Sequence, residues 1–160
     1  MDFSRRELIN IAIGIEKQGI AYYDVMAIST WHEIARDLFQ HLTDMERQHV
    51  EIFENMLSQY ESMSTIDEIS DENAAYIKGL INSAVFTDEM AANELATHID
   101  NEDEALDIAI GAEKDSILFY YNLQEMLSHP DDSPIKQIIN EEKLHLSQLS
   151  KLKEVLLDLR

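Results

Sequence analysis

Two Glu-x-x-His motifs stand ninety-six positions apart in this chain of 160 residues. Glu46 and His49 form the first motif. Glu142 and His145 form the second. In a helix, side chains three residues apart project from the same face, so each motif presents a carboxylate beside an imidazole. Because both groups are ligands of transition metals, the motifs predict metal binding.

A second repeat places one more Glu before each motif. The segment AIGIEK at positions 12–17 returns as AIGAEK at positions 109–114, and these segments carry Glu16 and Glu113 in apolar helical surroundings. Four carboxylates directed into one core are very costly unless their charge is balanced. Two divalent cations would balance it, and the two imidazoles would complete the coordination. We therefore predict a di-metal site formed by Glu16, Glu46, His49, Glu113, Glu142 and His145.

The alternative is that these six residues are buried polar groups with a structural role. Glu is so common in this chain that a Glu-x-x-His motif can arise by chance. Chance does not explain two motifs at one repeat offset, each with a Glu in the same apolar stripe about thirty residues upstream. The other histidines lack this context, and we expect them at the surface or in turns: His32, His41, His98 and His129.

The composition excludes several other kinds of chemistry. The absence of cysteine excludes disulfides, iron–sulfur clusters, thiolate zinc sites and thiol nucleophiles. A net charge of −20 argues against binding to nucleic acid or to an anionic membrane surface. The chain shows neither a leader peptide nor an apolar run long enough to span a membrane. We expect a cytoplasmic protein.

The elements that would position the site are long helices. An apolar content of 45% supports one core, and only four glycines and two prolines leave few turns. Three capping signals, each with Glu three residues later, predict helices: Ser4 at about 4–28, Thr30 at about 30–60 and Asn101 at about 101–128. Ser133 followed by Pro134 predicts the start of a fourth helix, which runs nearly to the C-terminus. Two apolar stripes agree with these helices: Ile34, Leu38, Leu42, Met45, His49, Ile52 and Met56 in one, and Leu106, Ile110, Glu113, Ile117, Tyr120, Gln124 and Leu127 in the other.

Short turns make each half of the chain an antiparallel helical hairpin, at about 4–60 and 101–159. The forty residues between them, 61–100, are too long for a tight turn and suggest a crossover between parallel helices. Within this crossover, Thr65 with Glu68 suggests a helix start, and we expect short helices near 74–84 and 88–99. The predicted fold is all-α: an antiparallel four-helix bundle of ferritin-like topology, with two pseudo-symmetric hairpins in a single domain.

Ferritin-like di-iron carboxylate proteins have one Glu on each of two helices and a Glu-x-x-His motif on each of the other two. The predicted site has the same pattern. Within this group the chain resembles the rubrerythrin-like family, and the segment AIGAEKDSILFYY at positions 109–121 is typical of it. The resemblance covers both hairpins. It implies that Glu46 and Glu142 bridge two irons. It also implies that Glu16 with His49 completes one iron, and that Glu113 with His145 completes the other.

The resemblance implies a di-iron oxidoreductase that reduces hydrogen peroxide or oxygen with electrons from an external donor. The chain lacks the Cys-rich rubredoxin-like domain of full rubrerythrins, and Ser116 stands where they tend to carry an extra Glu. Two alternatives stay open: a ferroxidase or iron-storage protein, and a metal-poor helical adaptor. Manganese or a mixed metal pair also suits these ligands. A homodimer is the expected oligomer.

Tyr23 and Tyr120 are equivalent in the repeat, and each follows a predicted ligand Glu by seven residues. Each tyrosine therefore lies on the same helix face as that Glu. We expect either a hydrogen bond from the hydroxyl group to a ligand carboxylate, which would orient it, or an ordinary core aromatic.

Overall fold

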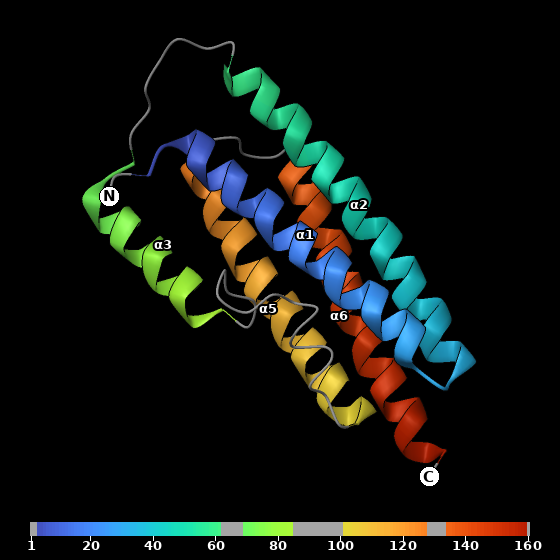
Figure 1. The fold of residues 1–160 in the computed structure, drawn as a ribbon. Helices are drawn as coiled ribbons and strands as arrows, with labels where there is room; N and C mark the ends of the chain where they lie inside the picture. Colours follow the sequence, from blue (N-terminus) through green and yellow to red (C-terminus); the bar gives the residue numbers. More distant parts are fainter. Residues whose placement is uncertain (1–2, 62–68, 85–100, 128–133, 160) are drawn as a thin grey trace.

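The computed structural model describes residues 3–61, 69–84, 101–127 and 134–159, which form the helices drawn in Figure 1. Their bounds are α1 (Arg5–Ser29), α2 (Glu33–Glu61), α3 (Asp71–Ser83), α5 (Glu102–Met126) and α6 (Pro134–Asp158). The predicted all-α class is confirmed. No helix in the described part of the chain combines the length and apolar character that crossing a membrane requires.

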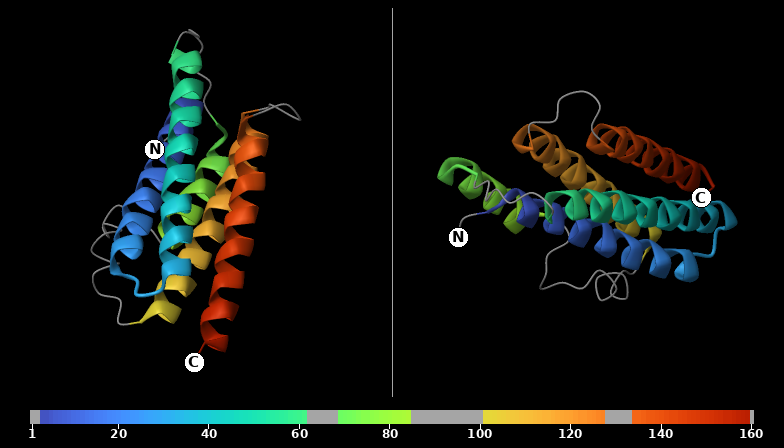
Figure 2. Two further views of the ribbon diagram at one scale, coloured as in Figure 1. Left: turned by 90° about the vertical axis from the view of Figure 1, so that its right-hand side faces the viewer. Right: turned by 90° about the horizontal axis from the view of Figure 1, so that it is seen from above.

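The four long helices form a bundle of two antiparallel hairpins, α1–α2 and α5–α6 (Figures 1 and 2). Across the bundle, α1 packs on α5, and α2 packs on α6. Helices α2 and α5 run in the same direction, because α2 ends at the end of the bundle opposite to the one where α5 begins (Figure 1). The predicted crossover between parallel helices is therefore confirmed.

Within the crossover, α3 lies outside the four-helix bundle along α5 (Figure 1). It begins at Asp71, three residues before the predicted start. The Ser70 hydroxyl group caps it by accepting a hydrogen bond from the Asn73 amide, 3.3 Å away. The predicted helix at 88–99 and the predicted start at Thr65 lie outside the described residues.

Two of the predicted helix starts have the expected caps. The Ser4 hydroxyl group accepts from the Glu7 amide at 3.2 Å, and the Ser4 amide donates to the Glu7 carboxylate at 2.6 Å, which completes a capping box. The Asn101 side chain accepts from the Glu104 amide at 2.8 Å. These contacts satisfy amide groups that have no partner inside the first turn of a helix.

The predicted capping box at Thr30 is wrong. Thr30 is the C-cap of α1, where its amide donates to the Met26 carbonyl at 3.0 Å, and α2 begins three residues later at Glu33. Its hydroxyl group donates to Glu102 at the start of α5 and accepts from the His32 amide at 3.3 Å. The residue thus links the turn of the first hairpin to the second hairpin.

The predicted apolar stripes contain buried positions, such as Leu42 and Leu106, but also positions at the edge of the buried faces. Ile34 is 59% exposed, whereas the next residue, Ala35, is buried. Ile110 and Ile117 on α5 are only half-buried. On α2 the buried positions include Ala35, Phe39, Leu42, Glu46, His49, Phe53 and Met56, and on α5 they include Leu106, Ala109, Glu113, Ser116, Tyr120, Leu123 and Leu127.

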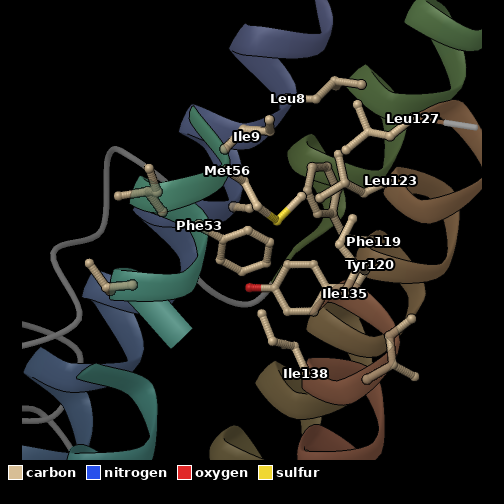
Figure 3. Close-up of a cluster of buried hydrophobic side chains, with 14 of the residues drawn as sticks. Leu8, Ile9, Phe53, Met56, Phe119, Tyr120, Leu123, Leu127, Ile135 and Ile138 are labelled. Carbon is tan, nitrogen blue, oxygen red and sulfur yellow. The ribbon is translucent and has the colours of Figure 1, made fainter. Parts of the chain in front are cut away.

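The core consists of two apolar clusters. Figure 3 shows residues of the first cluster, which lies near the start of α1 and the end of α5 and includes Leu8, Phe53, Tyr120 and Leu123. The second cluster lies near the α1–α2 turn and includes Tyr23, Phe39, Leu106 and Leu149. The six predicted metal ligands come between these clusters along their helices, so apolar side chains enclose them from both ends of the bundle.

Candidate metal centre

The structure brings all six predicted ligands together in one buried cluster. Glu16 comes from α1, Glu113 from α5, and one Glu-x-x-His pair from each of α2 and α6. None of the six residues is more than 4% exposed. A set of charged and polar side chains this deeply buried requires partners that balance its charge.

The cluster divides into two overlapping groups that could each hold one metal ion. In each group, one ligand atom per residue can be chosen so that all of these atoms lie within 4.8 Å of one another. The first group is Glu16, Glu46, His49 and Glu142, and the second is Glu46, Glu113, Glu142 and His145. Glu46 and Glu142 belong to both groups.

The two shared carboxylates divide their oxygen atoms between the two histidines. His49 Nδ1 lies 3.4 Å from Glu46 Oε2 and 2.9 Å from Glu142 Oε1. His145 Nδ1 lies 3.4 Å from the other oxygen of each residue, Glu46 Oε1 and Glu142 Oε2. Each carboxylate therefore has one oxygen on each side of the cluster.

Each of the other two carboxylates, Glu16 and Glu113, lies near only one of the two histidines. Glu16 Oε2 lies 3.3 Å from His49 Nδ1, and Glu113 Oε1 lies 3.9 Å from His145 Nδ1. The two imidazole rings are roughly parallel, with centroids 5.7 Å apart. The near-symmetric arrangement follows from the repeat, which gives each hairpin the same ligand types at the same depth.

Without metal, the cluster holds protons in place of cations. Burial and the charge of Glu16 raise the pKa of Glu46 to about 8. Burial and the charge of Glu142 raise the pKa of Glu113 well above its ordinary value. Burial acts to lower the pKa of His145, but the adjacent carboxylates of Glu142 and Glu46 raise it to about 10. Metal ions would have to displace these protons, because they bind the deprotonated ligands.

Two tyrosines contact, from the opposite half of the chain, the two carboxylates that belong to only one group each. The Tyr23 hydroxyl group donates a hydrogen bond to Glu113, and the Tyr120 hydroxyl group donates one to Glu16. Burial and the neighbouring carboxylates raise the pKa of both tyrosines well above its ordinary value, so both hydroxyl groups keep their protons. The hydrogen bonds that we expected as one of two alternatives are thus present.

Sequence reasoning missed Glu141, which lies next to the second motif. Its Oε2 atom is 2.8 Å from His49 Nε2, so it contacts a predicted ligand of the other hairpin. The repeat directed attention to positions that occur twice, and the equivalent position in the first half is Met45. The sequence feature that could have identified Glu141 is its place directly before the Glu of the second Glu-x-x-His motif.

Neither of the other two histidines in the described part of the chain joins the cluster. His32 is exposed, and its Nε2 atom lies 3.2 Å from Glu102. His41 is also exposed. Both therefore lie at the surface, as predicted. His98 and His129 lie outside the described residues.

The donor set fits a pair of metal ions. Mixed carboxylate and imidazole ligation suits Fe(II), and also Mn(II). Glu142 Oε1 and His145 Nδ1 are buried in the cluster and make no hydrogen bond of suitable geometry within the described part of the chain. A cation bound among the ligand residues would give both of these atoms a partner.

Comparisons with known proteins identify the family of this chain and proteins of similar fold. A family model described as Rubrerythrin matches residues 7–153. The structure is similar to a crystal structure from Thermotoga maritima, described as a candidate ferritin-like diiron-carboxylate protein, with a TM-score of 0.75 and 29% sequence identity. That match covers 96% of this chain and 97% of the other. None of the curated proteins matches this sequence.

Proposed function

Because the chain belongs to the rubrerythrin family, we propose that it is a di-iron oxidoreductase that reduces hydrogen peroxide or oxygen at a carboxylate-bridged site. This proposal rests on one observation: Glu46 and Glu142 each have one carboxylate oxygen near His49 and the other near His145. In this assignment Glu16 and His49 complete one metal position. Glu113 and His145 complete the other.

Two Fe(II) ions held by these residues would supply the two electrons that, with two protons, reduce one hydrogen peroxide molecule to two water molecules. The chain contributes the surroundings of that reaction. The two apolar clusters exclude water from either end of the site, which strengthens the electrostatic interactions within it. Tyr23 and Tyr120 hold the carboxylates of Glu113 and Glu16 in place.

Electrons are needed to restore the ferrous state after each turnover. The sequence has no cysteine, so it contains no iron–sulfur or dithiol group that could serve as a donor. We therefore propose an external electron donor. We also propose that the protein acts as a small oligomer, a homodimer being the expected form.

The test of the proposed function is stopped-flow absorbance after anaerobic Fe(II)-loaded protein is mixed with hydrogen peroxide or with oxygen. We expect two irons to be oxidised per peroxide, faster than free Fe(II) in the same buffer. Replacing Glu46 and Glu142 together by Ala should abolish the rapid phase, whereas the exposed Glu51→Ala should retain it. Oxidation no faster than that of free iron would contradict the enzyme assignment and favour a helical adaptor.

The iron-storage alternative differs in assembly. A storage protein keeps oxidised iron inside a cage of many subunits, whereas the proposed oxidoreductase retains only the two irons of its site. Size-exclusion chromatography of the iron-loaded protein separates the two cases. A particle of many subunits carrying more than two irons per chain would overturn our choice.

A further inference from the structure

We propose that Glu141 makes the two metal positions unequal, so that the position formed with Glu16 and His49 binds a divalent metal ion more tightly than the position formed with Glu113 and His145. This inference rests on the proposed di-metal site. It concerns a positioning residue, because Glu141 would act through His49 and would not itself bind the metal.

Glu141 lies on α6 and reaches across to a histidine on α2. Its Oε2 atom is 2.8 Å from His49 Nε2, and its Oε1 atom accepts a hydrogen bond from the Gln137 side chain at 3.0 Å. The Glu141 side chain is 26% exposed, whereas His49 is completely buried. The carboxylate is therefore held between the surface and the buried ring.

The contact determines which nitrogen of His49 can bind a metal. A proton on Nε2 donates to the Glu141 carboxylate, and this leaves the lone pair of Nδ1 directed at Glu16, Glu46 and Glu142. A carboxylate behind a ligand imidazole also raises its basicity and fixes the ring orientation. Both effects favour metal binding at the Glu16 and His49 position.

His145 has no such support. Its Nε2 atom is buried and has no hydrogen-bond partner among the residues that the structure describes. The ninety-six-residue offset that relates the two motifs places Met45 at the position equivalent to Glu141. A thioether is only a weak acceptor, so methionine cannot replace the carboxylate.

The two positions otherwise have the same types of ligand and of supporting residue, so Glu141 is the difference in residue type between them. Each position has one histidine, one non-bridging Glu and a tyrosine that donates to that Glu from the other half of the chain. Glu46 and Glu142 contribute one oxygen to each position. The unequal pair, Glu141 and Met45, is therefore the feature from which we infer unequal affinity.

The test is an anaerobic calorimetric titration of the metal-free protein with Mn(II), which needs no turnover. We expect two binding steps whose Kd values differ by about 10- to 100-fold, the usual effect of a carboxylate behind a metal-binding histidine. Glu141→Met should weaken the first step by a similar factor and leave the second unchanged. Glu54→Met, which removes a charge from an exposed position of α2, should change neither step.

Three further variants serve as controls for misfolding and assign the two binding steps to the two positions. Glu141→Gln keeps the shape of the side chain and an accepting oxygen, so a smaller weakening of the first step is expected. His145→Ala should keep the tight step, and His49→Ala should lose it. Circular dichroism would verify that each variant is folded.

The possible failures are distinguishable. Two equal steps in the unaltered protein, or equal weakening of both steps by Glu141→Met, would overturn the inference and leave the di-metal site intact. No Mn(II) binding to the unaltered protein would overturn both the inference and the proposed function.

Discussion

The hydroxyl group of Tyr23 on α1 donates a hydrogen bond to the carboxylate of Glu113 on α5. The same contact joins Tyr120 to Glu16 in the opposite direction, from α5 to α1. Each tyrosine places its ring in one of the two apolar clusters, as Figure 3 shows for Tyr120. The orientation of each carboxylate is therefore coupled to the packing of the core at one end of the bundle.

Replacing Tyr23 by Phe should weaken metal binding. The variant leaves Glu113 without its donor, and loss of a partner that orients a ligand typically costs about 10- to 100-fold in affinity. Mn(II) titration measures the change. Tyr22→Phe is the matched control, because the Tyr22 hydroxyl group donates at 2.7 Å to the Ala105 backbone carbonyl outside the cluster. Equal affinity of the Tyr23 variant and the unaltered protein would show that the hydrogen bond does not orient a ligand.

The stability of the metal-free protein should fall as the pH rises from about 5 to 10. The raised pKa values of Glu46, about 8, and His145, about 10, mean that the folded protein holds protons that the unfolded chain releases nearer to its ordinary pKa values of 4.5 and 6.5. A state that binds more protons loses relative stability as the pH rises. The contribution of Glu46 is therefore lost between about pH 4.5 and 8, and that of His145 between about pH 6.5 and 10.

Urea denaturation at several pH values, in the presence of a chelator, measures this dependence. Glu46→Gln is neutral at every pH, so it should flatten the fall between about pH 4.5 and 8. Stability that rises with pH over this range would contradict the protonated arrangement of the cluster.

Metal binding should stabilise the fold, and more strongly at higher pH. A ligand that binds only the folded state at 100 times its Kd adds about 2.7 kcal/mol to the free energy of unfolding. Because protons compete for the same atoms, the increase should grow between pH 6 and pH 9. Thermal unfolding with and without Mn(II) tests this, and Mg(II), which prefers oxygen ligands, serves as the control ion. An unchanged Tm would favour the adaptor alternative.

The apolar clusters should contribute to stability independently of metal. Leu123 is completely buried in the first cluster, and Leu123→Ala should lower the free energy of unfolding by about 2–5 kcal/mol. The loss should be equal with and without Mn(II), because the variant removes no predicted ligand. Leu144, which is 55% exposed on α6, provides the control, and Leu144→Ala should change the stability by less than about 0.5 kcal/mol. A much larger loss in only one metal state would mean that Leu123 also supports the site.

The repeat made most of the fold and the cluster predictable from sequence. Equivalent residues in two hairpins reach equivalent depths, so finding Glu16 with Glu113, and Glu46 with Glu142, was enough to place the four carboxylates together. The length of the crossover was enough to infer that α2 and α5 are parallel.

What could not be predicted depends on contacts between elements far apart in sequence. Thr30 has the sequence of a cap, but the hairpin turn brings its hydroxyl group to Glu102, seventy-two positions away. In the sequence, Glu141 reads as a surface residue of α6, because its contact with His49 arises only from the packing of α6 against α2. Ile34 was assigned to the buried face because it is the larger apolar residue, but it is 59% exposed and its neighbour Ala35 packs in the second apolar cluster.

The most direct test of the central claim is anomalous X-ray scattering at the iron edge from crystals of the protein loaded anaerobically with Fe(II). We predict two peaks, about 3.5–4 Å apart as in known two-metal sites, each within bonding distance of both Glu46 and Glu142. One peak should also lie beside Glu16 and His49, and the other beside Glu113 and His145. No peak between these residues, or iron only at the acidic surface, would contradict the account.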